Sequence, residues 1–168
     1  ADDFYTGTRA ALAGGTTTVM SFVVEDRNMS LIDAFNLNKE RASKKACCDY
    51  AFHSAISRYD DKVEKELEIL TKEKGINSFK CYMAYKDSLM LDDADIIKVA
   101  KKSKELGALL MIHAENGELI HECTEKIKKL GIMGPEGHLL SRPEPFEAEA
   151  TFRAVTIGEE INCPIYIV

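Results

Sequence analysis

The chain has 168 residues, 45% of them hydrophobic and 30% charged, and its formal net charge at pH 7 is −6. These proportions are ordinary for a globular domain, and the negative charge argues against nucleic acid and anionic membranes as partners, because both attract a basic face. The sequence contains no apolar run of the roughly 20 residues that a membrane-spanning helix needs, and no basic segment followed by an apolar one that would indicate a secretory signal.

Short apolar segments alternate with amphipathic segments along the chain. In chain order the pattern predicts a strand at 16–24, a helix at 30–43, a strand at 47–57, a helix at 61–74, a strand at 78–84, a helix at 92–106, a strand at 108–114, a helix at 117–130, a loop at 131–143, a helix to about 160 and a strand at 164–168. The helix at 61–74 carries Val63, Leu67 and Leu70 on one apolar stripe. Ser30 begins an S-x-x-D sequence, which is typical of a helix N-terminus.

The spacing of the expected strands is regular. They begin near residues 16, 47, 78 and 108, in steps of 31, 31 and 30 residues, and each step has the length of one βα unit. Such repetition predicts a parallel α/β sheet, either open and doubly wound or closed as a (β/α)₈ barrel. Glycine-rich phosphate-binding motifs are missing after every strand, which weakens the nucleotide-binding alternative. Five strands cannot close an eight-stranded barrel, so in a barrel this chain would be one part.

The five cysteines are interpreted as reduced residues of a cytoplasmic protein. Their number is odd, and no two of them form a C-x-x-C motif. Most lie in apolar segments, which favours packing in the core over a disulfide or a zinc site. They are Cys47, Cys48, Cys81, Cys123 and Cys163.

A lysine interrupts the apolar stretch NSFKCYMAYK at residues 77–86. Burial of an unpaired ammonium group is costly, so Lys80 either reaches solvent or a carboxylate, or it has a lowered pKa. A lysine of the second kind offers a free amine as a nucleophile. That amine could form a Schiff base, or it could capture carbon dioxide as a carbamate, an anionic ligand with two oxygens that can bridge two divalent metal ions.

Two further residues lie where a barrel would have its active site. His113 ends the apolar run LLMI at the carboxyl end of a strand, where it either packs or binds a metal ion. Lys80 is on the preceding strand, so the two side chains would be neighbours if both point into the barrel. Tyr85 follows the strand of Lys80, where it could hydrogen-bond a substrate, stabilise an oxyanion or simply pack.

The other three histidines have simpler interpretations. We expect His53 to pack in the core, His121 to lie on a solvated helix face, and His138 to be either structural or close to a substrate in the loop at 131–143.

Long stretches of the sequence resemble dihydropyrimidinases and related hydantoinases. They are DDFYTGTRAALAGGTTTV, CCDYAFH, NSFKCYMAYKD, GALLMIHAENGELI, LGIMGPEGHLLSRPEPFEAEATFRAVTI and NCPIYIV, and together they span essentially the whole chain. The resemblance implies a metal-dependent amidohydrolase, built as a (β/α)₈ TIM-type barrel with a two-metal centre. Residues 1–168 would be the central part of that single catalytic barrel, from about its second to its sixth strand.

The resemblance also implies roles for three residues. Lys80 matches the lysine that becomes N6-carboxylysine, through a carbamate derived from CO₂, and bridges two Zn²⁺ ions per subunit. His113, in H-A-E-N-G, matches a metal ligand, and Tyr85, in M-A-Y-K, matches the tyrosine that contacts the substrate and stabilises the tetrahedral intermediate. The implied reaction is attack of a metal-bridging hydroxide on the cyclic amide of a 5,6-dihydropyrimidine or a hydantoin. The ring opens to an N-carbamoyl amino acid, as in pyrimidine degradation.

Some features of the family have no match here. Its H-x-H pair, a later histidine ligand and the catalytic aspartate are expected outside residues 1–168, so the chain alone should be neither a closed barrel nor a hydrolase. Ser21, Phe22 and Glu25 stand where relatives often have Asp-His and a proline.

The alternative function is that of a collapsin response mediator protein, a non-catalytic neuronal protein that interacts with the cytoskeleton. Such proteins share the fold and most of the motifs but generally lack the bridging lysine, so Lys80 favours the enzyme. The resemblance further implies a cytoplasmic homotetramer that acts on a small molecule, with no nucleic-acid or membrane partner.

Overall fold

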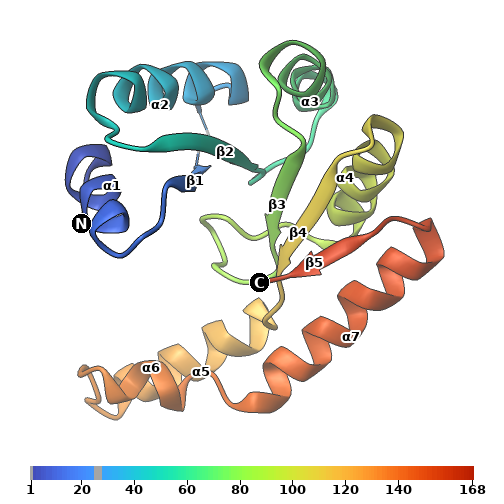
Figure 1. Cartoon of the computed structure of the whole chain (residues 1–168). Helices are drawn as coiled ribbons and strands as arrows, with labels where there is room; N and C mark the ends of the chain where they lie inside the picture. Colours follow the sequence, from blue (N-terminus) through green and yellow to red (C-terminus); the bar gives the residue numbers. More distant parts are fainter. Residues whose placement is uncertain (1, 25–27) are drawn as a thin grey trace.

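Five parallel strands form one sheet, in the same order in space as in the chain (Figure 1). The computed structural model describes residues 2–24 and 28–168. Its strands are β1 (Thr18–Val23), β2 (Asp49–Ala55), β3 (Ser78–Tyr82), β4 (Leu109–His113) and β5 (Ile165–Ile167). Each strand pairs with the next one along the chain. This is the order of a (β/α)₈ barrel, whereas an open doubly wound sheet reverses its order at a switch point.

Helices connect the strands and cover the outer side of the sheet. They are α1 (Phe4–Ala13), α2 (Leu31–Lys45), α3 (Asp61–Lys74), α4 (Asp93–Leu106), α5 (Gly117–Lys129), α6 (Glu136–Leu140) and α7 (Glu144–Ile161). In Figure 1, α2, α3, α4 and α7 follow one another around the outside of the strands, while α5 and α6 extend from the end of β4. Every strand and helix that the sequence predicts is confirmed, with ends that shift by a few residues.

Two helices were not expected. The first, α1, begins with a capping box in which Asp3 and Thr6 bond each other's backbone N–H groups. Its threonines and glycine are weak helix formers, which hid it from the sequence pattern. The second, α6, is a short helix within the stretch 131–143, which we had expected to be a loop.

The helix ends place the next strands. Ser30 accepts a hydrogen bond from the N–H of Asp33 at the start of α2, as its S-x-x-D sequence predicts. Gly75 and Gly107 end α3 and α4 with φ of 76° and 66°, in the left-handed region that favours glycine. The chain therefore turns sharply into β3 and β4, which carry two of the three candidate residues.

The two faces of the sheet differ in chemistry, because alternate residues of a strand point to opposite sides. The outer face of β3 and β4 carries Phe79, Cys81, Leu110 and Ile112, all fully buried beneath the helices. Full burial of a side chain such as Phe or Ile contributes about 1.5–3 kcal/mol. The inner face of the same strands carries Lys80 and His113. The core therefore lies between sheet and helices, and the inner face is left for chemistry.

The burial of the cysteines differs partly from the expectation. All five cysteines are free. Cys81 and Cys163 are buried, but Cys47 is exposed and Cys48 and Cys123 are half-buried, so packing in the core is wrong for these three. Cys47 lies in the connection before β2, which starts only at residue 49. Ser21 and Phe22 lie in β1, and Glu25 lies outside the described residues.

Within the described ranges, no helix has both the length and the apolar composition to cross a bilayer.

A buried lysine joins α3 to α4. Lys102 is 4% exposed, and its Nζ contacts the carboxylates of Glu68, of Glu105 at 3.0 Å and of Glu64 at 3.7 Å. The hydrogen bond to Glu68 raises the pKa of Lys102, and the same bond lowers the pKa of Glu68. The ammonium group is thus fully compensated, which is what a purely structural buried lysine requires.

We expect Lys102→Met to lower the free energy of unfolding by about 1–3 kcal/mol, because hydrogen bonds to charged groups are lost while the stem still packs. The pairing with Glu68 is present above the usual carboxyl pKa of 4.5 and is lost as the pH falls through the lowered value. Urea unfolding at pH 7 and pH 3 should therefore show a smaller difference between variant and wild type in acid. Lys101→Met, at an exposed neighbour, is the control. Equal unfolding midpoints at pH 7 would contradict this role.

Candidate active site

Lys80 lies on the inner face of β3, with no compensating charge among the residues that the structure describes. It is half-buried, and its Nζ lies 4.2 Å from the centroid of the Phe22 ring and 4.8 Å from that of the Tyr82 ring. In the described part of the chain no carboxylate lies within ion-pair distance of this ammonium. Burial lowers the pKa of Lys80. The neutral amine is therefore easier to form here than on an ordinary surface lysine.

His113 lies on the same face, on the neighbouring strand. Lys80 pairs with Met111 and Tyr82 pairs with His113 in the register of β3 and β4. Paired residues of parallel strands point to the same side, and so do residues two apart. Lys80 and His113 are thus neighbours on one face, with His113 nearer the carboxyl end, as the sequence predicts.

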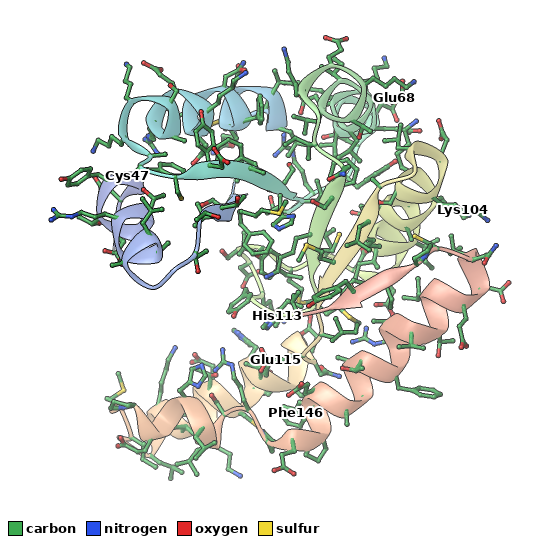
Figure 2. All side chains as sticks on the ribbon, in the orientation of Figure 1. Cys47, Glu68, Lys104, His113, Glu115 and Phe146 are labelled. Carbon is green, nitrogen blue, oxygen red and sulfur yellow. The ribbon has the colours of Figure 1, made fainter. Side chains whose placement is uncertain are left out.

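A carboxylate and a guanidinium group accompany the histidine. Nε2 of His113 lies 2.7 Å from Oε2 of Glu115, and Nε of Arg142 lies 3.5 Å from Oε1 of the same carboxylate. Figure 2 shows His113 at the end of β4 and Glu115 close to it. Neither of these two partners of His113 is predicted from the sequence. The signal available for Glu115 was its place two residues after the histidine, whereas Arg142 comes from the distant stretch 131–143.

Tyr85 stands in the loop after β3, close to the histidine. Its ring centroid lies 5.1 Å from that of His113 and 5.7 Å from that of Tyr82. Its φ of 66° is in the left-handed region, where a tyrosine is strained. Backbone strain of this kind persists where the surroundings impose it, and it is common in binding and catalytic sites. The side chain is 42% exposed, so its hydroxyl is accessible to a ligand.

The loop of Tyr85 is fastened to the start of α5. The N–H of Gly117 donates to the carbonyl of Met83 at 3.1 Å. A Cβ at position 117 would lie 2.7 Å from that carbonyl oxygen and 2.9 Å from Cα of Ala84. Lys86 adds an ion pair of 2.6 Å to Glu118. Only a glycine permits this close approach of the two backbones, which fixes the position of Tyr85 relative to His113.

The described residues fit part of a metal centre. A lysine with a lowered pKa and no carboxylate partner suits conversion into a carbamate, and the hydrogen bond of His113 to Glu115 uses only one of the two ring nitrogens. A neutral imidazole nitrogen is a common zinc ligand. However, no cluster of three or more His, Cys, Asp or Glu residues that could hold a metal ion occurs in the ranges 2–24 and 28–168. Lys80 and His113 can therefore supply only some of the ligands.

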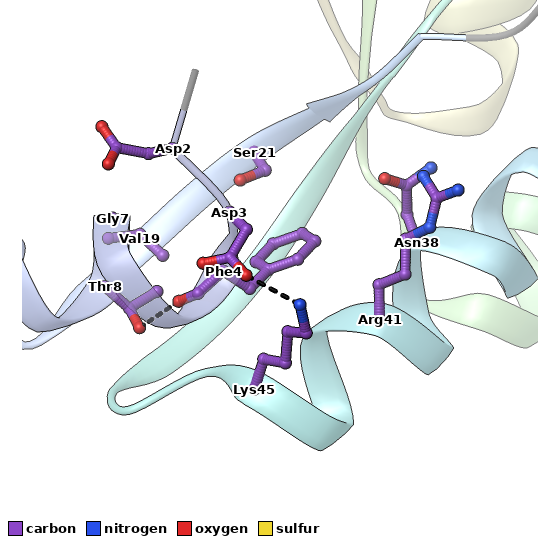
Figure 3. A pocket seen from close by; sticks show the side chains of 10 residues that line it. All are labelled: Asp2, Asp3, Phe4, Gly7, Thr8, Val19, Ser21, Asn38, Arg41 and Lys45. Carbon is purple, nitrogen blue, oxygen red and sulfur yellow. Dashed lines mark hydrogen bonds and ion pairs between the residues drawn. The ribbon is translucent and has the colours of Figure 1, made fainter.

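A cavity of about 650 Å³ lies elsewhere, between α1, α2 and β1 (Figure 3). Its wall includes Phe4, Val19, Ser21 and the ion pair of Lys45 with Asp3, whose Nζ and Oδ2 lie 2.7 Å apart. None of the three candidate residues lines it. Its size therefore does not indicate the place of the chemistry.

The remaining histidines differ partly from expectation. His53 is half-buried on the inner face, where Nδ1 lies 2.5 Å from Oγ of Ser78, so packing in the core is wrong for it. Burial, and secondly the charge of Lys80, lower the pKa of His53. His121 is half-buried rather than solvated, and His138 is exposed in α6.

No family model matches the chain, but individual relatives match almost all of it. Dihydropyrimidinase of Rattus norvegicus is 51% identical over 167 residues, which are 99% of this chain and 32% of the relative. Dihydropyrimidinase-related protein 5 of Homo sapiens is 49% identical over 167 residues, again 99% of this chain and 30% of the relative. The chain thus spans about a third of the length of the curated relatives that it matches.

Solved structures agree with these relatives. The D-hydantoinase from Bacillus sp. AR9 superposes with a TM-score of 0.96 at 41% identity, over 99% of this chain and 36% of the other. The superposition confirms that the five strands and the helices between them are arranged as in part of a (β/α)₈ barrel. With this fold, and with about half of its residues identical to those relatives, the chain belongs to the family of dihydropyrimidinases, D-hydantoinases and dihydropyrimidinase-related proteins.

Proposed function

We propose that the protein carrying this chain hydrolyses the cyclic amide bond of a 5,6-dihydropyrimidine or a hydantoin and releases an N-carbamoyl amino acid. The observation that carries the proposal is the uncompensated Lys80 beside His113 on the inner face of the sheet. In a (β/α)₈ barrel, the carboxyl ends of the strands form the active site. Residues 1–168 would be the central part of that barrel. A cytoplasmic location and a homotetrameric assembly are proposed from the resemblance alone.

In this proposal Lys80, as N6-carboxylysine, and His113 would hold two Zn²⁺ ions. When bound, such ions lower the pKa of a water molecule and polarise the carbonyl group of the substrate. Lys80 enters this arrangement through its neutral amine: the nitrogen attacks the carbon of CO₂, a C–N bond forms, and a proton leaves to solvent. The product is an anion, so the half-buried positive charge beside Phe22 and Tyr82 is exchanged for a negative charge that the bound cations would compensate.

The proposal gives the other residues supporting tasks. The exposed hydroxyl of Tyr85 can donate a hydrogen bond to an oxyanion that develops on the substrate. The rings of Phe22 and Tyr82 limit the access of water to the Lys80 nitrogen. Glu115 accepts the hydrogen bond of the His113 ring and fixes its orientation.

A second function is favoured by a specific comparison. The 49% identity to human dihydropyrimidinase-related protein 5 is nearly as high as that to the rat dihydropyrimidinase. A non-catalytic protein of the collapsin response mediator type, which interacts with the cytoskeleton, is therefore the alternative. Lys80 argues against it, because a protein without a metal pair has no need for an uncompensated lysine at this position.

Lys80→Ala in the complete protein should abolish zinc uptake and lower the rate of dihydrouracil ring opening by roughly 1,000-fold or more, because the functions of the metal pair are lost together. Zinc is measured by elemental analysis, and ring opening by the loss of ultraviolet absorbance of the amide. Lys74→Ala, at an exposed lysine of α3, should change neither. Retention of both metals and activity by Lys80→Ala would refute the role of Lys80. A wild-type protein with neither metal nor activity would support the alternative.

Tyr85→Phe should lower kcat/KM for dihydrouracil by roughly 100- to 1,000-fold with zinc content unchanged, because one hydrogen-bond donor to the oxyanion is lost. Steady-state kinetics and elemental analysis on the same preparation separate the two effects. Tyr5→Phe, at an exposed tyrosine of α1, is the matched control. A rate within about twofold of wild type would exclude the hydroxyl of Tyr85 from the reaction.

A further inference from the structure

We infer that Glu115, held in turn by Arg142, is a positioning residue: it fixes the His113 ring in the tautomer that carries the proton on Nε2 and leaves Nδ1 free for a divalent cation. The inference rests on the proposed function, because a metal ligand is what gives this tautomer its purpose. It extends the supporting task of Glu115 to the choice of the tautomer and adds Arg142, which has no expected role.

The carboxylate of Glu115 makes its two contacts through different oxygens. Oε2 lies 2.7 Å from Nε2 of His113, and Oε1 lies 3.5 Å from Nε of Arg142. The side chains of His113, Glu115 and Arg142 are 17–23% exposed, so the two contacts lie mostly out of water. Contacts of this kind between charged groups are stronger when they are shielded from solvent.

The protonation of the ring follows from the partner. An ionised carboxylate can only accept hydrogen bonds, so Nε2 of His113 must donate. In a neutral imidazole the proton is then used up, and Nδ1 keeps its lone pair. No hydrogen bond to Nδ1 occurs in the described part of the chain. Histidines that bind metals usually donate their second ring N–H to a carboxylate or a carbonyl group, which orients the ring and makes it a better ligand.

Arg142 holds Glu115 in place through its second oxygen, because Nε of Arg142 lies 3.5 Å from Oε1 of the carboxylate. Arg142 is itself anchored, because Nη1 lies 3.1 Å from Oγ of Ser141, a residue that is 2% exposed and donates to the carbonyl of His138. The contacts of Glu115 and Arg142 are thus connected to a buried, hydrogen-bonded part of the segment that follows α5.

The backbone around Glu115 is fixed on the other side by α7. The N–H of Asn116 donates to the carbonyl of Phe146 at 3.0 Å, and Nδ2 of Asn116 donates to Oε2 of Glu149 at 2.7 Å. Figure 2 shows Phe146 at the start of α7, close below Glu115. Residues 131–143 and α7 therefore supply the groups that orient Glu115 toward the histidine.

The test is zinc affinity in the complete protein, measured by competition with a chelator, together with the nitrogen NMR shifts of the His113 ring in the zinc-free protein. Glu115→Ala should weaken zinc binding roughly 10- to 100-fold and convert a pure Nε2–H tautomer into a mixture. Glu115→Gln, which keeps an acceptor oxygen, should restore most of the tautomer, and Arg142→Gln should weaken zinc binding less than Glu115→Ala does. Glu122→Ala, an exposed glutamate of α5, should change neither measurement.

Two outcomes are decisive against the inference: wild-type zinc affinity in Glu115→Ala, or an Nε2–H tautomer that persists without the carboxylate. If Glu115→Ala does not fold, Arg142→Gln is the deciding variant, and wild-type zinc affinity together with an unchanged tautomer in it would contradict the inference. A wild-type protein that binds no zinc would overturn the proposed function. The tautomer would then still decide whether Glu115 positions the ring, since that measurement needs no metal.

Discussion

The parallel register between β3 and β4 is the constraint on which the candidate site depends. Lys80 is opposite Met111, and Tyr82 is opposite His113. Side chains alternate between the two faces of a strand. If β3 or β4 slipped by one residue, Lys80 or His113 would point into the packed layer under the helices, and Phe79 or Leu110 would move to the inner face. The fully buried residues of the outer face therefore hold the polar residues of the inner face in position.

The two lysines show how different surroundings give the same side chain different properties. Lys102 contacts three carboxylates on the outer side, and its pKa is raised. Lys80 has two aromatic rings next to its Nζ, and its pKa is lowered. The first arrangement stabilises a charge and joins two helices. The second favours loss of the charge, which suits a residue that is to be modified or to bind a ligand.

The sequence predicts the repeat better than it predicts the site. Regular steps of about 30 residues between the apolar runs are enough for the parallel order and for Lys80 and His113 on neighbouring strands. The pairing of Glu115 with Arg142 could not be predicted, because it depends on the path of residues 131–143 back toward β4. The left-handed backbone of Tyr85 likewise depends on surrounding contacts and not on its own propensity.

Local signals also failed where weak helix formers or short elements are involved. The capping box of α1 is visible only if Thr6 is considered as a partner of Asp3, and α6 has five residues, too few for a periodic pattern. Cys47 and Cys48 show a similar limit: their positions just before the start of β2 decide their burial, and the ends of an element are the part that sequence patterns place least well.

The close approach at Gly117 has a mechanical consequence. Since α5 begins in direct backbone contact with the segment that leads to Tyr85, and that segment also hydrogen-bonds to the end of β4 through Met83 and His113, these three pieces must shift as one body. Any opening or closing around a small molecule would have to be carried by other parts of the protein, while the tyrosine and the histidine keep a constant separation. One side of the candidate site is therefore rigid, and a ligand would have to fit the fixed positions of Tyr85 and His113.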